Sequence, residues 1–233
     1  MLLLFDIDGT LVSGATEAHQ AAMYEALSAV HSLDTNRARR RRLAPAGRTD
    51  PEIARTLLLD AGVSAERIDD RADAVRDACC SAYARLCPPD LSRFVLPGVG
   101  ELLSWLSGRP DVKLGLLTGN YEVVARLKLA RARIGSYFPG EQGAFGSDHE
   151  DRAALPAIAR RRAGRVGSPY PRERTIVIGD TPRDIACARA DDVGCVAIAT
   201  GPFAAGELSD ADAVVAGADE LRAVLGHRLA SLS

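Results

Sequence analysis

The chain has 233 residues and a formal net charge of −2, which argues against a general nucleic-acid-binding protein. No apolar run approaches the roughly 20 residues that a membrane span requires. The apolar N-terminal residues are followed at once by an acidic pair, which is not the pattern of a signal peptide. The five cysteines form no C-x-x-C pair and predict reduced thiols in a cytoplasmic protein. We therefore expect a globular protein with no nucleic acid and no membrane as partners.

The first strand is predicted over residues 2–5, where four apolar residues precede Asp6, Asp8 and Gly9. Such a run is typical of a parallel sheet, in which both faces of a strand are buried. Two carboxylates at the end of a buried strand cost several kcal/mol unless a cation or a reacting group lies nearby. A turn-capping role explains one aspartate well and two poorly. The pair therefore indicates a functional site.

The next part of the sequence is predicted to be helical. Apolar periodicity indicates helices over 17–30, 51–61 and 65–86, without a clear strand between them, and a Cys87-Pro88-Pro89 breaker ends this stretch. We expect an all-helical unit over 15–95, joined by linkers near 13–16 and 88–97 to a core formed by 1–14 and 96–233.

Beyond this insert, strands alternate with helices. Strands are predicted at 113–117, 144–145, 175–178 and 195–198, and helices at 99–106, 122–132, 152–163, 183–190 and 219–225. This alternation is typical of right-handed βαβ units around a parallel sheet. The fold class is therefore predicted to be α/β, a Rossmann-like parallel sheet with an inserted all-helical domain.

Polar residues follow three of these strands where the strands end, which is the edge where open α/β sheets bind ligands. Four clustered carboxylates need positive charge nearby, and an all-oxygen site suits Mg²⁺. A hydroxyl and a backbone N–H at a strand-to-helix turn are suited to an anion such as phosphate. The residues are Asp6 and Asp8, then Thr118, Gly119 and Asn120, then Asp180 and Asp184.

Three segments, FDIDGTL, LLTGN and VIGDTPRD, resemble the first, second and fourth motifs of the haloacid dehalogenase superfamily, in the same order. The helical insert lies where the C1 cap of that superfamily lies, as in its phosphoglycolate-phosphatase-like branch. The resemblance implies that Asp6 is the nucleophile and Asp8 the acid and then the base. Members that cleave carbon–halogen bonds lack the second aspartate, so a dehalogenase is not expected.

The resemblance also implies the remaining ligands. Mg²⁺ would be coordinated by Asp6, Asp180 and the backbone carbonyl of Asp8, with Asp184 acting at a distance or through water. Phosphoryl oxygens would be bound by Thr118, Gly119 and Asn120.

At the third motif this chain departs from the superfamily. The superfamily normally has a lysine after the third strand, but no lysine follows Lys128 in this chain. The basic residue at the corresponding place is Arg152, whose guanidinium could bridge Asp6 to a phosphate oxygen. The alternative is that Arg152 is a surface residue in the first turn of a helix. His149, a lone histidine on a loop, is not assigned a role.

Two features of the insert are ambiguous. Arg48 is either a solvated side chain or a substrate-specificity residue of the kind found in related caps, and Asp50 is expected to be the N-cap of the following helix. The arginine-rich run over 37–42 is more consistent with a solvated face than with recruitment of an anionic substrate.

The function predicted from these observations is a Mg²⁺-dependent phosphatase that hydrolyses a small phosphate monoester through an aspartyl-phosphate. The alternatives are a sugar phosphomutase of the same fold and a non-catalytic protein that binds phosphate esters. The substrate and the choice between monomer and homodimer stay open at this point.

Overall fold

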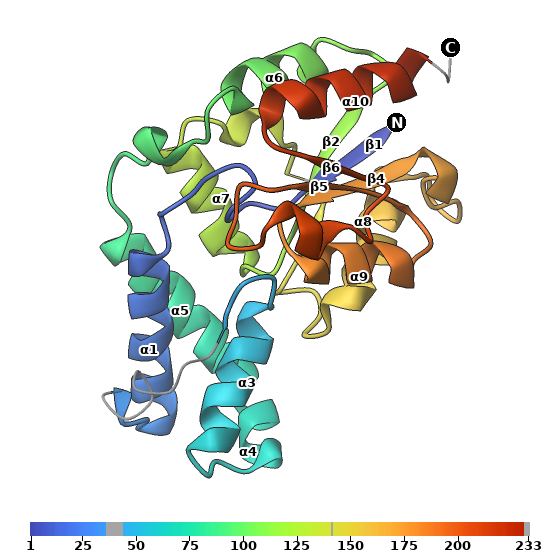
Figure 1. The fold of residues 1–233 in the computed structure, drawn as a ribbon. Coiled ribbons are helices and arrows are strands. Elements are labelled where there is room, and N and C mark those ends of the chain that lie inside the picture. Colours follow the sequence, from blue (N-terminus) through green and yellow to red (C-terminus); the bar gives the residue numbers. More distant parts are fainter. Residues whose placement is uncertain (36–43, 141, 231–233) are drawn as a thin grey trace.

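The computed structural model describes residues 1–35, 44–140 and 142–230 and contains a parallel sheet, ordered β3-β2-β1-β4-β5-β6 in the described residues (Figure 1). Its strands are β1 (Leu2–Phe5), β2 (Lys113–Thr118), β3 (Ala144–Phe145), β4 (Thr175–Gly179), β5 (Gly194–Ile198) and β6 (Ala213–Val215). Every pairing between neighbours is parallel. The predicted α/β class is confirmed, with one short edge strand, β6, that the apolar pattern did not reveal.

Helices cover both faces of the sheet because successive residues of a buried strand point to opposite sides. Leu3 and Phe5 share a core with α6, α7 and α10, whereas Leu2 and Leu4 share a second core with α8 and α9. The helices are α6 (Val99–Ser107), α7 (Glu122–Arg131), α8 (Leu155–Ala163), α9 (Pro182–Ala190) and α10 (Ala218–Ala230), and the short 3₁₀ helices are η1 (Ser92–Phe94), η2 (Gly135–Tyr137), η3 (Arg152–Ala154), η4 (Arg172–Arg174) and η5 (Ala205–Leu208).

Between β1 and α6 the described chain is mainly helical, and its helices form a separate group that faces the carboxyl ends of the strands (Figure 1). This helical insert consists of α1 (Glu17–His31), α3 (Asp50–Asp60), α4 (Ala65–Asp70) and α5 (Ala72–Leu86). The helix expected over 65–86 is interrupted at Arg71, whose φ of −113° and ψ of 7° lie outside the helical range. The arginine-rich run over 37–42 lies outside the described residues.

The expected N-cap at Asp50 is wrong. The cap of α3 is Thr49, whose side-chain oxygen accepts a hydrogen bond from the Glu52 N–H at 3.2 Å, and Asp50 is the first residue of the helix. A threonine with extended φ and ψ satisfies the cap requirement and frees the Asp50 carboxylate for contacts outside its own helix.

The two connections between the insert and the sheet are hydrogen-bonded to each other. Val12 and Val95 form an antiparallel bridge, Ser13 N–H donates to the Phe94 carbonyl at 2.8 Å, and Leu96 N–H donates to the Leu11 carbonyl at 3.0 Å. The two tethers therefore form one short ribbon. No helix in the described residues is long and apolar enough to cross a membrane.

Candidate active site

The candidate site lies where three adjacent strands end. β1 is paired with β2 on one side and β4 on the other, with Phe5 opposite Leu116 and Ile178. The residues that follow these strands are thereby brought to one cavity of about 520 Å³, whose wall includes Asp6, Asp8, Thr118, Gly119, Asn120 and Asp180, together with Arg152 and Arg48. The sheet register thus gathers the predicted site residues, except that Asp184 does not line the cavity.

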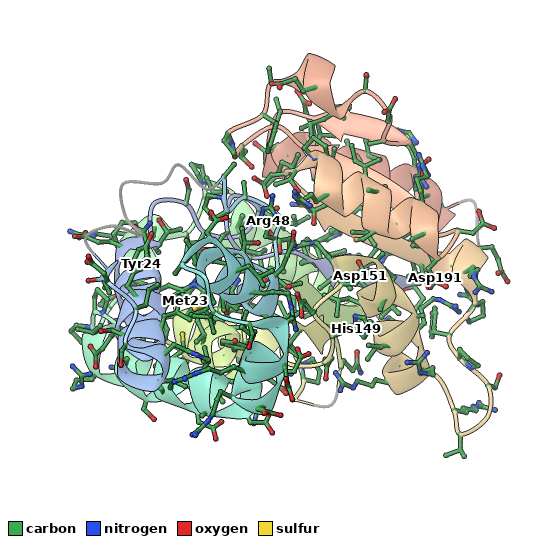
Figure 2. All side chains as sticks on the ribbon, turned by 90° about the horizontal axis from the view of Figure 1, so that it is seen from below. Met23, Tyr24, Arg48, His149, Asp151 and Asp191 are labelled. Carbon is green, nitrogen blue, oxygen red and sulfur yellow. The ribbon has the colours of Figure 1, made fainter. Side chains whose placement is uncertain are left out.

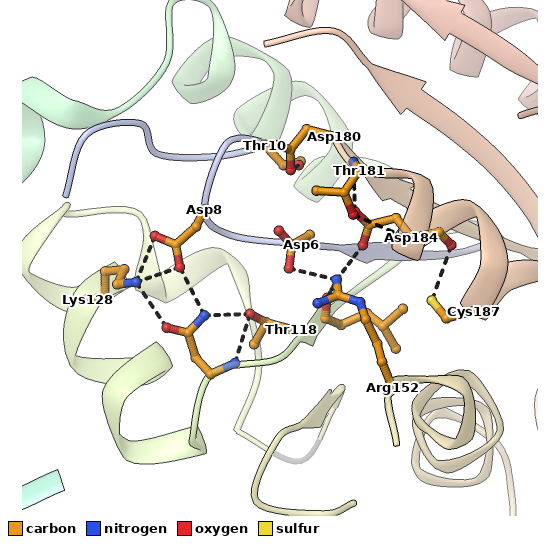
Figure 3. A network of polar contacts seen from close by, with 12 residues as sticks. Asp6, Asp8, Thr10, Thr118, Lys128, Arg152, Asp180, Thr181, Asp184 and Cys187 are labelled. Carbon is orange, nitrogen blue, oxygen red and sulfur yellow. Dashed lines mark hydrogen bonds and ion pairs between the residues drawn. The ribbon is translucent and has the colours of Figure 1, made fainter. Parts of the chain in front are cut away.

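Asp6 is held by an arginine that follows β3, the edge strand next to β2 (Figure 3). Arg152, at the start of η3, places Nη2 3.0 Å from Asp6 Oδ1, and the same nitrogen contacts Asp184 Oδ1. All three side chains are buried. Burial is the largest influence on the Asp6 carboxyl, and despite Arg152 it raises the pKa of Asp6 to about 7. Arg152 therefore joins two carboxylates through one nitrogen.

Asp184 is anchored by its own helix. Its Oδ2 accepts hydrogen bonds from Thr181 N–H at 3.0 Å and Thr181 Oγ1 at 2.6 Å, which forms the capping box of α9. Because its oxygens already have these partners, Asp184 is placed to orient Arg152.

The buried carboxylate of Asp180 has fewer stabilising partners than those of Asp6 and Asp184. Thr10 Oγ1 donates to Asp180 Oδ1 at 3.1 Å, and no cation contacts Asp180 in the described part of the chain. Burial, followed by the nearby Asp6 and Asp184 carboxylates, raises the pKa of Asp180 to about 8. Backbone packs closely around it, since a Cβ added at Gly9 would lie 2.2 Å from Asp180 Oδ2.

This acidic cluster fits a divalent cation. One carboxylate oxygen from each of Asp6, Asp180 and Asp184 lies within 4.8 Å of the others, and all three residues are buried. Arg152 offsets only one of the three negative charges. Hard oxygen donors with surplus negative charge are what Mg²⁺ prefers.

Asp8 has a different environment from Asp6 (Figure 3). Lys128 Nζ, from α7, lies 2.8 and 2.6 Å from the two Asp8 carboxylate oxygens and 3.0 Å from Asn120 Oδ1. Asn120 Nδ2 donates to Asp8 Oδ2 at 3.0 Å and to Thr118 Oγ1 at 2.8 Å. Burial alone would raise the pKa of Asp8, but Lys128 outweighs it and the pKa lies below its usual value.

The sequence interpretation missed Lys128, although two signals pointed to it. The chain has two lysines, Lys113 and Lys128, among 29 basic residues. Lys128 also falls on the buried stripe of α7 with Val124, Ala125 and Leu129, and its side chain is fully buried. A lysine on the apolar face of a helix requires a buried anionic partner.

The helical insert closes over this site at Gly119. Asp50 N–H donates to the Gly119 carbonyl at 2.8 Å, and Asp50 Oδ2 accepts from Tyr121 N–H at 2.7 Å. A Cβ added at Gly119 would lie 2.0 Å from the Arg48 carbonyl oxygen, so only glycine permits this approach. A further contact runs from Thr49 Oγ1 to the Glu150 carbonyl at 2.5 Å.

Arg48 lines the cavity, but its guanidinium is occupied. Nη1 pairs with Glu52, and Nε donates to the Ala44 carbonyl at 3.2 Å. His149 lies on an exposed loop, where its Nδ1 accepts from Asp151 N–H at 2.9 Å. Figure 2 labels Arg48 near the junction of the insert and the sheet, away from His149.

Comparisons with known proteins identify the family. A phosphoglycolate phosphatase from Pseudomonas syringae pv. syringae is 27% identical over 204 residues, covering 86% of this chain and 70% of the relative. The fold resembles a hydrolase from Pseudomonas syringae (TM-score 0.65, 23% identity, 97% and 98% of the two chains). It also resembles CbbY from Rhodobacter sphaeroides in complex with phosphate (TM-score 0.61, 17% identity, 94% and 95%). The haloacid dehalogenase-like hydrolase family matches residues 3–189, so the chain belongs to that family and the predictions of the superfamily and of a hydrolase are confirmed.

Proposed function

We propose that the protein is a Mg²⁺-dependent phosphatase that hydrolyses a small phosphate monoester through an aspartyl-phosphate on Asp6. One observation carries this proposal: Asp6 and Asp8, two residues apart, are held in contrasting environments within one cavity. Asp6 belongs to the acidic cluster with Arg152, whereas Asp8 is paired with Lys128. Two carboxylates that have separate partners in one cavity can take separate parts in a reaction, one as nucleophile and one in proton transfer. The curated relatives named phosphoglycolate phosphatase support the same reaction class.

In the first step, a carboxylate oxygen of Asp6 attacks phosphorus, and the bond from phosphorus to the ester oxygen breaks. Asp8 in its acid form gives its proton to that oxygen, so the leaving group departs as an alcohol. In the second step, Asp8 as a carboxylate accepts a proton from water, the water oxygen attacks phosphorus, and the bond between phosphorus and the Asp6 oxygen breaks. Inorganic phosphate is released, and both carboxyl groups return to their starting states.

Mg²⁺, when bound, would neutralise charge on the phosphoryl oxygens and on the carboxylates beside them. Asp6 and Asp180 offer the oxygens that would hold it, together with the backbone carbonyl of Asp8. Asp184 would act indirectly, since its oxygens already contact Thr181 and Arg152.

The phosphoryl group would be bound by the residues after β2. Thr118 Oγ1 accepts from Asn120 in both of its contacts, so its own hydrogen can be donated to a phosphoryl oxygen. Asn120 orients both Thr118 and Asp8, and the Gly119 N–H lies at the same turn. Arg152 would keep Asp6 aligned for attack.

The helical insert would act as a cap over residues 15–95, with 1–14 and 96–233 as the core. Its contacts at Gly119 and Glu150 describe a closed state, which would exclude water and select the leaving group. All five cysteines are free thiols, which supports a cytoplasmic location.

The test is phosphate release from a panel of phosphate monoesters with and without Mg²⁺. Asp6→Asn should abolish release while the protein stays folded, and Asp192→Asn, a matched change at an exposed turn, should leave activity intact. Retained activity in folded Asp6→Asn would contradict the proposal. Dependence on a bisphosphate primer with little phosphate release would indicate a mutase, and tight binding without turnover would indicate a non-catalytic protein.

A further inference from the structure

The part of the cavity formed by the insert differs in character from the part formed by the strand ends. Met23 and Tyr24 on α1 and Ile53 and Leu57 on α3 line it, and Met23, Tyr24 and Leu57 are buried. Figure 2 labels Met23 and Tyr24 beside α1. The contacts of Asp50 with Gly119 and Tyr121 hold this apolar wall over the strand ends. A leaving group attached to phosphorus at Asp6 would therefore extend toward apolar side chains.

The cavity is large for a short leaving group. Its volume of about 520 Å³ lies within the range of roughly 300–1,000 Å³ that holds drug-sized ligands. A phosphate ester with a two-carbon leaving group would leave most of this volume unfilled, and a longer apolar chain would gain the burial that the wall offers.

The charges on the described wall disfavour an anionic leaving group. Four aspartates and two arginines line the cavity in the described part of the chain. One arginine, Arg152, contacts Asp6 and Asp184, and the other, Arg48, is paired with Glu52. Each guanidinium is thus already paired with a carboxylate of this chain, so neither brings an unneutralised positive charge to the described wall.

His19 on α1 and Asp50 on α3 are paired on the insert side of the cavity, and this pair has the same consequence. His19 Nε2 lies 3.0 Å from Asp50 Oδ2, which also accepts the Tyr121 N–H. Because Asp50 is a carboxylate and only accepts, Nε2 carries the hydrogen of this contact. A carboxylate on the substrate would be repelled here by the nearby Asp50 carboxylate, whereas an uncharged leaving group would not be.

From this arrangement we infer that the site acts on phosphate monoesters whose leaving group is uncharged and carries an apolar portion of several carbons. This rests on the proposed phosphatase function and deepens it. The inferred leaving group also differs from the one in the relatives' name, phosphoglycolate phosphatase, because glycolate is a short carboxylate.

The experiment compares esters with similar alkoxide leaving groups: ethyl, butyl and hexyl phosphate, with phosphoglycolate as the anionic member. We expect kcat/KM to rise about threefold or more for each methylene that the wall buries, and phosphoglycolate to fall below butyl phosphate. The inference is overturned if phosphoglycolate is the best substrate, or if chain length has no effect while phosphate is still released. Either result leaves the phosphatase proposal standing.

Binding provides a readout that is independent of turnover. Calorimetry with hexylphosphonate and phosphonoacetate, which cannot be hydrolysed, should show tighter binding of hexylphosphonate. If no ester is hydrolysed but this order of affinities holds, the phosphatase proposal fails and the preference survives; the opposite order of affinities refutes the preference.

A charge-introducing variant tests the wall itself. Ile53→Lys adds a cation beside the leaving group and should raise the ratio of phosphoglycolate to butyl phosphate kcat/KM by about tenfold or more. Val166→Lys adds the same charge at a fully exposed residue outside the cavity wall and should leave the ratio unchanged. An equal ratio in wild type and in a folded Ile53→Lys variant would refute the assignment of this wall to the leaving group.

Discussion

Replacement of Lys128 by methionine should weaken both folding and catalysis. The lysine side chain is fully buried, whereas the Asp8 side chain is 26% exposed toward the cavity. Removing one partner of a fully buried ion pair costs about 3–5 kcal/mol. Because Asp8 keeps the Asn120 contact and partial exposure, we expect about 2 kcal/mol here, which corresponds to a Tm lower by about 4–8 °C for a chain of this size.

The catalytic effect follows from the position and the pKa of Asp8. Lys128 supplies the contacts to both Asp8 oxygens, so its loss should reduce kcat by about 10²-fold, within the range that positioned proton transfer contributes. Lys128 lowers the pKa of Asp8, so the variant should have a higher one. Leaving-group departure needs the acid form of Asp8 and slows as pH rises through that pKa. The falling limb of the kcat/KM profile should therefore move to higher pH in the variant.

The assay is steady-state phosphate release at saturating Mg²⁺ from about pH 3 to 9, a range that includes the low pKa of wild-type Asp8, with thermal denaturation on the same samples. Lys113→Met is the matched control, because Lys113 contacts the Ala163 carbonyl at 2.8 Å at the opposite end of β2. Lys113→Met should leave kcat and the pH profile unchanged. A Lys128→Met protein with wild-type kcat, Tm and pH profile would refute the reasoning.

Three further predictions concern the rest of the site. Arg152→Lys should reduce kcat by about tenfold and Arg152→Met by more, because an ammonium keeps the charge but lacks the rigid guanidinium that places Nη2 between Asp6 and Asp184; kinetics of the folded variants decide this. The pKa of Asp6 is raised to about 7 and that of Asp180 to about 8 in the folded protein, so their stabilising protons are fully present below about pH 4 and are lost as pH rises toward 8. Metal-free protein should thus lose stability over that interval, and Mg²⁺ should raise Tm more at pH 8 than at pH 5; an equal gain at both values would count against the acidic cluster as the metal site. Gly119→Ala places a Cβ 2.0 Å from the Arg48 carbonyl oxygen and should lower kcat/KM at least about tenfold by preventing closure, with little change in the Tm of the core; wild-type kcat/KM would contradict this.

The sequence predicted where the site lies but not how its charges are paired. In a parallel sheet the carboxyl ends of neighbouring strands meet at one edge, so Asp6, Thr118 and Asp180 could be placed together from the strand pattern alone. The ion pair between Asp8 and Lys128 joins residues 120 positions apart, and it depends on how α7 packs against the sheet. The place of Lys128 on the apolar stripe of α7 indicates that it needs an anionic partner, but only the tertiary packing determines which carboxylate it meets.

Two smaller errors of the sequence prediction, the N-cap of α3 and the missed strand β6, arise where the local sequence signals compete or are too short. Thr49 and Asp50 are both good N-cap residues, and the choice between them depended on a partner for the Asp50 carboxylate, Tyr121, which lies 71 positions away. β6 has three residues and lies at the edge of the sheet, so its apolar pattern is too short to distinguish a strand from a loop.

The paired tethers between sheet and insert also limit how the insert can move. Val12 is bridged to Val95, and the N–H groups of Ser13 and Leu96 donate hydrogen bonds across the same ribbon. The two tethers are therefore coupled to each other. They attach the insert to the sheet as one unit, in the position where Asp50 contacts the backbone of Gly119 and Tyr121. This attachment fixes which side chains of the insert face Asp6.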